Sequence, residues 1–245
     1  MSESRLLIDL GNSRAKWLWA RGRTIDSDSS GRGDMAALAD ACRAGDALQP
    51  DAVLISSVAS PARTGEVREL CLGCWGVEAR LLRAEARQGG VRNGYAEPGR
   101  LGVDRWLAIV GAVERYGAPL VVWDLGTATT LDAVDASGQH LGGWILPGPS
   151  AMLDALRNGT QLPVPTDLRG AGPIRPGRST AECIARGVLA AQAGALAQLM
   201  QNVSRHAEAE PLLVVTGGAA ADLLPLLDVE HIHDPWLVFR GMLVD

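Results

Sequence analysis

Two short polar turns carry the residues in this sequence that are best suited to phosphate chemistry. The first runs from Asp9 to Lys16 after a short apolar segment, and the second runs from Asp124 to Thr130 after another. Each turn combines a carboxylate and a glycine with hydroxyl or amide side chains. Together these groups offer backbone N–H donors and oxygen ligands to an anionic group and its metal. The pattern predicts a pair of phosphate-binding turns.

Either turn alone is also a common structural feature, but recurrence in the same setting favours a clamp. In such a clamp one turn holds terminal phosphates with Lys16, and the other holds phosphate oxygens and cations with Asp124. The chain has 22 arginines and a single lysine, which is Lys16. A bias in the base composition of the gene explains the shortage of lysine. The position of the single lysine in this turn also suits phosphate binding by a compact ammonium group.

Two further groups stand at the ends of predicted elements. Asp104 and Arg105 follow Gly102 at the start of a predicted helix. In the functional interpretation, Asp104 accepts a proton from a substrate hydroxyl and Arg105 holds a substrate anion. In the structural alternative, the acid only interacts favourably with the helix dipole. Gly217 and Gly218, at a strand-to-helix junction, either let a base or ribose approach the backbone or form a tight turn.

The elements that position these groups alternate in two similar halves. The apolar pattern predicts strands over residues 6–8, 15–20, 52–58, 77–82, 120–125, 129–134, 140–146, 212–215 and 229–233, and helices over 34–44, 61–73, 101–116, 151–158, 180–205 and 219–227. We therefore expect two similar α/β domains, residues 1–117 and 118–245, that face each other across a cleft. The loop over residues 83–100, which contains Tyr95, is either a connector or a functional loop.

Composition narrows the class of protein. A hydrophobic content of 47% is ample for a packed core. A net charge of −5 and a pI near 5.4 argue against a nucleic acid or a membrane surface as the main partner. No uninterrupted apolar run reaches the roughly 18 residues of a membrane span, and the N-terminal residues do not form a signal peptide, so we expect a cytoplasmic protein. The chain contains neither GxxxxGK[ST], GxGxxG nor GxSxG, and its one CxxC motif, Cys71–Cys74, has no second pair.

Taken together, the motifs resemble those of the type III pantothenate kinase family, within the actin-like, acetate and sugar kinase superfamily. The resemblance is carried, in order, by Asp9–Ser13, Gly102–Arg105, Asp124–Thr130, Gly142–Gly148 and Thr216–Gly218. It implies two ribonuclease-H-like (actin-like ATPase) domains in tandem with a cleft between them. It also implies ATP-dependent phosphorylation of pantothenate to 4′-phosphopantothenate, the first step of coenzyme A biosynthesis.

The resemblance further implies roles for individual residues. The residues expected to bind ATP are Asp9, Leu10, Gly11, Asn12, Ser13, Arg14, Ala15, Lys16, Thr127, Gly217 and Gly218. Those expected to bind pantothenate are Tyr95, Gly102, Val103, Asp104, Arg105 and Thr180, with Asp104 also the catalytic base. Asp124 is expected to bind a monovalent cation, K⁺ or NH₄⁺, and ATP is expected to arrive with Mg²⁺. The family is dimeric, so we expect a homodimer, with the long helix from Thr180 as a candidate interface.

Two alternatives remain at this point. One is another small-molecule kinase of the same superfamily, such as a sugar or acetate kinase, which a panel of substrates would separate. The other is a non-catalytic descendant that binds nucleotide and regulates partners or expression. Loss of Asp104 or Asp124 would favour the second alternative, and both residues are present.

Overall fold

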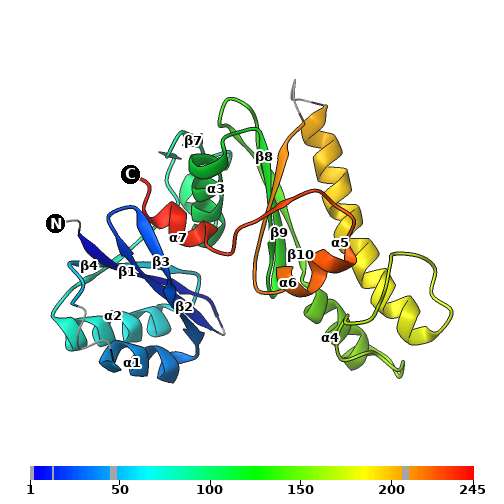
Figure 1. The fold of residues 1–245 in the computed structure, drawn as a ribbon, viewed down its shortest axis with the longest axis horizontal. Helices are drawn as coiled ribbons and strands as arrows, with labels where there is room; N and C mark the ends of the chain where they lie inside the picture. The colour runs from blue at the N-terminus through cyan, green and yellow to red at the C-terminus, as the bar shows by residue number, and fades with distance from the viewer. Residues whose placement is uncertain (1–2, 13, 45–48, 206–209) are drawn as a thin grey trace. The chain divides into compact units, whose positions relative to one another are not determined.

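The computed structural model describes residues 3–12, 14–44, 49–205 and 210–245. The chain divides into two compact units (Figure 1), residues 1–115 together with 236–245, and residues 116–235. The sequence-based division after residue 117 lies two residues from this boundary and treats the C-terminal residues differently. The last ten residues return to the first unit, because their apolar side chains pack there rather than in the second unit.

The first unit is built on a five-stranded sheet in the order β3-β2-β1-β4-β5. Strands β1 to β3 are antiparallel neighbours, and β4 and β5 continue the sheet in parallel with β1. The strand bounds are Ser4–Leu10 for β1, Ala15–Arg21 for β2, Thr24–Gly33 for β3, Ala52–Ser57 for β4 and Ala79–Leu81 for β5. The central strands β1 and β4 have buried apolar runs because both faces of the sheet are covered.

The second unit repeats this sheet in the order β10-β9-β8-β11-β12. Its pairing directions match those of the first sheet strand for strand, antiparallel on one side of β8 and parallel on the other. The bounds are Leu120–Leu125 for β8, Ala128–Val134 for β9, His140–Pro147 for β10, Leu212–Thr216 for β11 and Ile232–His233 for β12. The predicted duplication of one α/β plan is confirmed.

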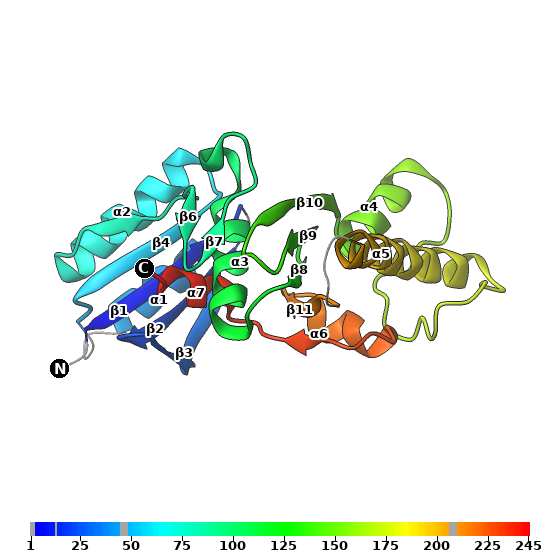
Figure 2. The ribbon, with the colours of Figure 1, turned by 90° about the horizontal axis from the view of Figure 1, so that it is seen from above.

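Helices cover both faces of the first sheet (Figure 2). Helices α1 (Met35–Ala44) and α2 (Pro61–Trp75) pack against one face, where they form an apolar core with Leu6, Ile8 and Leu10 of β1. Helix α2 begins at a Ser60 cap and ends at Gly76 in the left-handed conformation. Helices α3 (Val103–Tyr116) and α7 (Leu237–Met242) lie on the other face.

A glycine contact holds α7 against α3. A Cβ atom on Gly241 would lie 2.0 Å from the carbonyl oxygen of Leu107, so the two backbones touch at this point. Gly111 makes the reciprocal approach, since its Cβ would lie 2.3 Å from the Leu237 oxygen. The C-terminal segment thus supports the helix whose first turn carries Asp104.

In the second unit, α4 (Pro149–Gly159), α5 (Thr180–Ser204) and the short α6 (Ala220–Leu223) accompany the sheet. By length and composition α5 would suffice to cross a membrane, but nine of its residues are buried, and most of them belong to the core of this unit. Packing therefore accounts for part of its hydropathy, since 44% of its most apolar stretch is buried. Helix α5 begins at a Ser179 cap, whose Oγ accepts a hydrogen bond from the backbone of Glu182 at 3.3 Å.

Three local expectations differ from the structure. The sequence did not predict β3, because this strand is rich in Ser and Asp and most of it is exposed. The helix expected over residues 219–227 ends at Leu223 and gives way to a 3₁₀ turn, η2 (Leu224–Leu226), that contains Pro225. The last strand is confined to Ile232–His233.

The loop over residues 83–100 contains a small hairpin, β6 (Arg87–Gln88) with β7 (Val91–Arg92), and the 3₁₀ turn η1 (Pro98–Arg100).

Candidate active site

The carboxyl group of Asp9 lies near the end of β1, where both neighbouring strands supply polar partners. Parallel β4 sets Ser56 beside it, and Ser56 Oγ donates a hydrogen bond to Asp9 Oδ1 at 3.1 Å. Antiparallel β2 sets Lys16 opposite, and the ammonium group attracts the carboxylate. Sequence reasoning missed Ser56, although its position near the end of a buried strand next to β1 is a usable signal.

The turn between β1 and β2 is closed by its own backbone and held by a distant arginine. The N–H of Gly11 donates to the carbonyl of Arg14 at 3.0 Å. Arg63, in the first turn of α2, donates from Nη1 to the carbonyl of Asn12 at 2.6 Å. Arg63 is a second residue that the sequence did not single out, since the contact joins positions 51 apart. Ser13 lies outside the described residues.

The other turn residues predicted to bind ATP fall into two groups. The side chains of Leu10 and Ala15 are fully buried in the core, so these residues can offer a ligand only their backbone. Asn12, Arg14 and Lys16 are exposed and can offer their side chains. The turn therefore presents amide, guanidinium and ammonium donors to solvent, a set that matches the charge of a phosphate chain.

The pKa of Asp9 is higher than is usual for an aspartate. Burial raises its pKa from the ordinary value of 3.8 to about 6, although Lys16 and Ser56 act in the opposite direction. The carboxylate of Asp104 contributes to the increase, which brings these two acids into one electrostatic neighbourhood. The residue as a whole keeps some exposed surface, but its carboxyl group is enclosed by protein, and that enclosure sets the pKa.

The second acid, Asp104, occupies the first turn of α3, as expected. Its Oδ1 accepts a hydrogen bond from the backbone of Arg105 at 2.8 Å. Gly102 leaves room for this arrangement, since a Cβ there would lie 2.8 Å from the same oxygen. The side chain of Val103 points into the core and is 8% exposed.

Arg105 and Tyr95 form a pair beside Asp104. Arg105 Nη1 donates to the Tyr95 hydroxyl at 3.0 Å, and the guanidinium carbon lies 5.8 Å from the centre of the tyrosine ring. The loop that carries Tyr95 is fastened by Asn93. Its Nδ2 donates to the Glu85 carbonyl at 3.0 Å, and its Oδ1 accepts from the Tyr95 backbone at 2.9 Å. The loop is thus a positioned part of the first unit.

In the second unit, close-packed glycines surround Asp124. Asp124 lies beside Thr216 of the parallel strand β11, and Gly217 follows directly. Gly217 has φ +99°, and a Cβ there would lie 2.4 Å from Asp124 Oδ1 and 2.5 Å from the backbone of Leu125. Only glycine fits this conformation and this space. Gly218, by contrast, has open space around it.

A second glycine brings the start of α4 onto the same turn. A Cβ on Gly148 would lie 2.2 Å from the Gly126 carbonyl oxygen and 2.6 Å from that of Thr127. The N–H of Gly148 donates to the Thr127 carbonyl at 3.0 Å, while the Thr127 residue itself is exposed. The predicted turn over residues 124–130 is therefore a backbone cradle built from β8, β10 and β11, with an exposed threonine at its tip.

The donor set of these sites suits a nucleotide that brings its own metal. Among the described residues, no group of three or more His, Cys, Asp and Glu side chains is arranged to hold a metal ion. Mg²⁺ is commonly bound by one or two carboxylates together with substrate phosphates and water. Within the first unit Asp9 fits that mode, and within the second unit Asp124 with the exposed Thr127 does. Thr180 is exposed as the first residue of α5, directly after its Ser179 cap.

Replacing Asp9 by Asn should stabilise the free protein at pH 8 by on the order of 1–3 kcal/mol. The folded pKa exceeds the unfolded one, so the wild-type free energy of unfolding falls as the pH rises from about 4 to about 6. The gain in Asp9→Asn should disappear near pH 4. Denaturation in guanidinium at several pH values in this range measures the free energy of unfolding of wild type and variant. Asp28→Asn, which changes an exposed acid on β3, is the control. A gain that is equal at pH 4 and pH 8 would contradict this explanation.

Gly217→Ala should destabilise the protein by on the order of 2 kcal/mol or more, because the added Cβ meets backbone atoms in a left-handed conformation. Gly218→Ala is the matched control, since no atom lies within 4 Å of its Cβ position. Its effect should stay within about 0.5 kcal/mol. Urea denaturation of the three proteins makes the comparison, and equal losses in both variants would show that the close approach has no energetic weight.

Comparison with known proteins identifies the family. The family profile described as type III pantothenate kinase matches residues 5–202. A type III pantothenate kinase from Halorhodospira halophila is 37% identical over 98% of this chain and 96% of its own length. Another, from Methylibium petroleiphilum, is 38% identical over 97% of this chain and 96% of its own length.

Solved structures share the fold at lower identity. A conserved putative Baf family transcriptional activator from Campylobacter jejuni aligns with a TM-score of 0.58 and 22% identity, over 97% of this chain and 94% of that one. Component A of the (R)-2-hydroxyglutaryl-CoA dehydratase from Acidaminococcus fermentans aligns with a TM-score of 0.52 and 15% identity, over 99% and 95%. These likenesses show an actin-like ATPase fold, and the match along the sequence shows that the chain belongs to the type III pantothenate kinase family.

Proposed function

We propose that this protein transfers the γ-phosphoryl group of ATP to the primary hydroxyl of pantothenate, which yields 4′-phosphopantothenate and ADP. This reaction is the first step of coenzyme A biosynthesis. One observation carries the assignment of residues. Asp104 and the turn that begins at Asp9 belong to the same unit, and Asp104 acts on the pKa of Asp9. A candidate base and a candidate phosphate turn are thus neighbours.

In the proposed reaction, Asp104 accepts the proton of the substrate hydroxyl as its oxygen bonds to the γ-phosphorus. The bond between that phosphorus and the β,γ-bridging oxygen breaks, and ADP leaves. Lys16 offsets negative charge on the phosphates. Mg²⁺ bound to ATP supplies further charge neutralisation when it is present. The side chains that accept the proton and neutralise the phosphates would all come from the first unit.

Arg105 and Tyr95 are the proposed contacts for pantothenate. Arg105 is buried and already bound to Tyr95, so its guanidinium is oriented before substrate arrives. A preorganised guanidinium suits a carboxylate, which accepts two parallel hydrogen bonds from it. Gly102, Val103 and Thr180 complete the proposed substrate contacts, with Val103 limited to its backbone.

The second unit would hold the nucleotide and a monovalent cation. We assign the cation, K⁺ or NH₄⁺, to Asp124, and the nucleotide to Thr127, Gly217 and Gly218. The fit rests on the cradle around Asp124, which a Cβ at Gly217 would fill. The absence of a side chain at Gly218 leaves space for a flat group against the backbone.

We further propose that the protein is a cytoplasmic homodimer that acts on these small molecules rather than on nucleic acid or membrane. The acidic pI supports the choice of small molecules over nucleic acid or membrane. Helix α5 supports the homodimer, because its exposed residues include small ones, namely Ala181, Gly187, Ala190, Gly194 and Ala197. Small side chains on an exposed helix face allow another helix to pack closely.

Asp104→Asn should lower kcat by about 10²- to 10⁴-fold, because the amide cannot accept the proton. The affinity for ATP should change by less than about threefold. A coupled assay of ADP release with pantothenate, Mg²⁺ and K⁺ or NH₄⁺ measures turnover, and calorimetry measures ATP binding. Glu114→Gln, an exposed acid near the end of the same helix, is the matched control.

The outcomes separate the residue assignment from the function. Unchanged turnover in Asp104→Asn would refute the base. Wild-type protein that is inactive on pantothenate under these conditions, but active on acetate or a sugar, would replace the substrate with that of another kinase. Binding of ATP without turnover on any acceptor would favour a nucleotide-binding regulator.

A further inference from the structure

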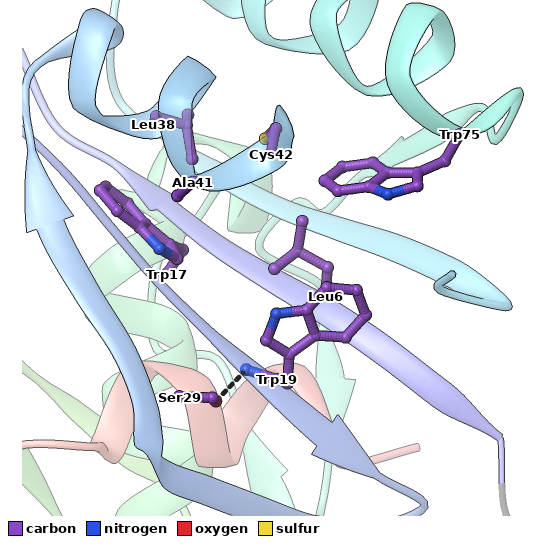
Figure 3. A pocket seen from close by; sticks show the side chains of 8 residues that line it. All are labelled: Leu6, Trp17, Trp19, Ser29, Leu38, Ala41, Cys42 and Trp75. Atoms are coloured by element: carbon purple, nitrogen blue, oxygen red, sulfur yellow. Dashed lines mark hydrogen bonds between the residues drawn. The ribbon is translucent and has the colours of Figure 1, made fainter. Parts of the chain in front are cut away.

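The first unit contains a cavity of about 210 Å³ that the proposed reaction does not use (Figure 3). The cavity lies between the sheet and helices α1 and α2. Side chains alternate along β1, so Leu6 faces this cavity while Asp9 points to the opposite face of the sheet. Leu6 is also paired with Trp19, whereas Asp9 is paired with Lys16. The cavity therefore lies on the opposite face of the sheet from the side chains of Asp9 and Lys16.

The walls of the cavity are aromatic and uncharged. Trp17 and Trp19 of β2 and Trp75 at the end of α2 all line it, three of the seven tryptophans in the chain. The rings of Trp19 and Trp75 meet edge to face, with centroids 6.1 Å apart and planes at 83°. The space beside them suits a further aromatic ring, because such pairs favour offset or edge-to-face contact. No lining residue carries a charge, so an anionic ligand would lose its hydration without compensation.

The size of the cavity limits the ligand. An apolar cavity of about 150 Å³ holds benzene, and drug-sized ligands occupy roughly 300–1,000 Å³. The volume found in this protein lies between these values. It matches a molecule of one ring or two fused rings.

Ser29 provides a hydrogen-bond acceptor among the residues that line the cavity. Its hydroxyl accepts a hydrogen bond from the Trp19 backbone at 2.8 Å and donates one to the Asp26 carbonyl at 2.6 Å. A hydroxyl has one proton and two lone pairs, so this oxygen can accept one more hydrogen bond and can donate none. The other polar groups of the lining side chains are the thiol of Cys42 and the indole N–H groups of the three tryptophans. A hydrogen bond with Cys71 and burial raise the pKa of the Cys42 thiol, which keeps it neutral.

We propose that this cavity is a binding site for a small neutral aromatic molecule of one or two rings that carries a single N–H or O–H donor for Ser29. Indole has this chemistry and serves as the probe. Benzofuran has the same two-ring shape without the N–H group and serves as its matched partner.

Calorimetric titration of the full chain tests the proposal. Indole should bind at one site per chain, and benzofuran should bind about 2- to 10-fold more weakly, the range expected for one neutral hydrogen bond. Saturating ATP and pantothenate should leave both affinities unchanged. Displacement of indole by either substrate would assign the binding to the active site and overturn the proposal.

Two variants locate the site. Ala41→Leu adds three carbons to the cavity wall and should weaken indole binding at least 10-fold, whereas Ala36→Leu, exposed on the same helix, should not. Ser29→Ala should lower the affinity for indole to that for benzofuran and leave benzofuran unaffected. Circular dichroism and thermal unfolding verify that each variant is folded. Absence of indole binding up to its solubility limit, or equal binding by wild type and folded Ala41→Leu, would refute the site.

Discussion

The candidate site in the first unit depends on the carboxyl group of Asp9, which is held where water cannot fully solvate it. Asp9 keeps this position because strand pairing on both sides brings its partners, Ser56 from β4 and Lys16 from β2. A shift of either register by one residue would turn the partner to the other face of the sheet. The raised pKa shows that these partners do not fully offset the cost of enclosure. The remaining cost is typical of groups that are arranged for a ligand rather than for stability.

The second unit places an acid at the equivalent position of its sheet but pairs it with different side chains. Asp124 occupies the position in β8 that Asp9 occupies in β1, one residue before a buried leucine at the strand end. In both sheets the parallel neighbour supplies a hydroxyl residue at the matching register, Ser56 in one and Thr216 in the other. The antiparallel neighbour differs, since Lys16 in the first sheet is replaced by Thr130 in the second. At this register position the first sheet thus places a cation opposite the acid, and the second sheet places a hydroxyl.

Apolar periodicity was enough to predict the central strands, the long helices and the duplication. It failed where an element lacks a buried face, as in β3, whose polar residues are held by pairing with β2 rather than by a core. It also failed for contacts between distant positions. The hydrogen bond from Arg63 to Asn12 depends on how α2 packs against the sheet, and no local pattern encodes that. The two turns at Asp9 and Asp124 were recognisable because an acid, a glycine and polar side chains follow an apolar strand in each half of the sequence.

The charge balance of the first unit explains why the proposed reaction needs cations beyond the protein's own. Asp104 lies close enough to Asp9 to raise the pKa of Asp9, so the two carboxyl groups share one electrostatic neighbourhood. A nucleotide triphosphate would add several negative charges to the same region. Arg14 and Lys16 supply two positive charges on the turn, which are too few to balance two carboxylates and a triphosphate. A divalent ion carried by the nucleotide would offset this imbalance, and its arrival would also favour the ionised form of Asp9, whose pKa is raised in the free protein. Nucleotide binding and the ionisation of Asp9 are therefore coupled through electrostatics in the proposed mechanism.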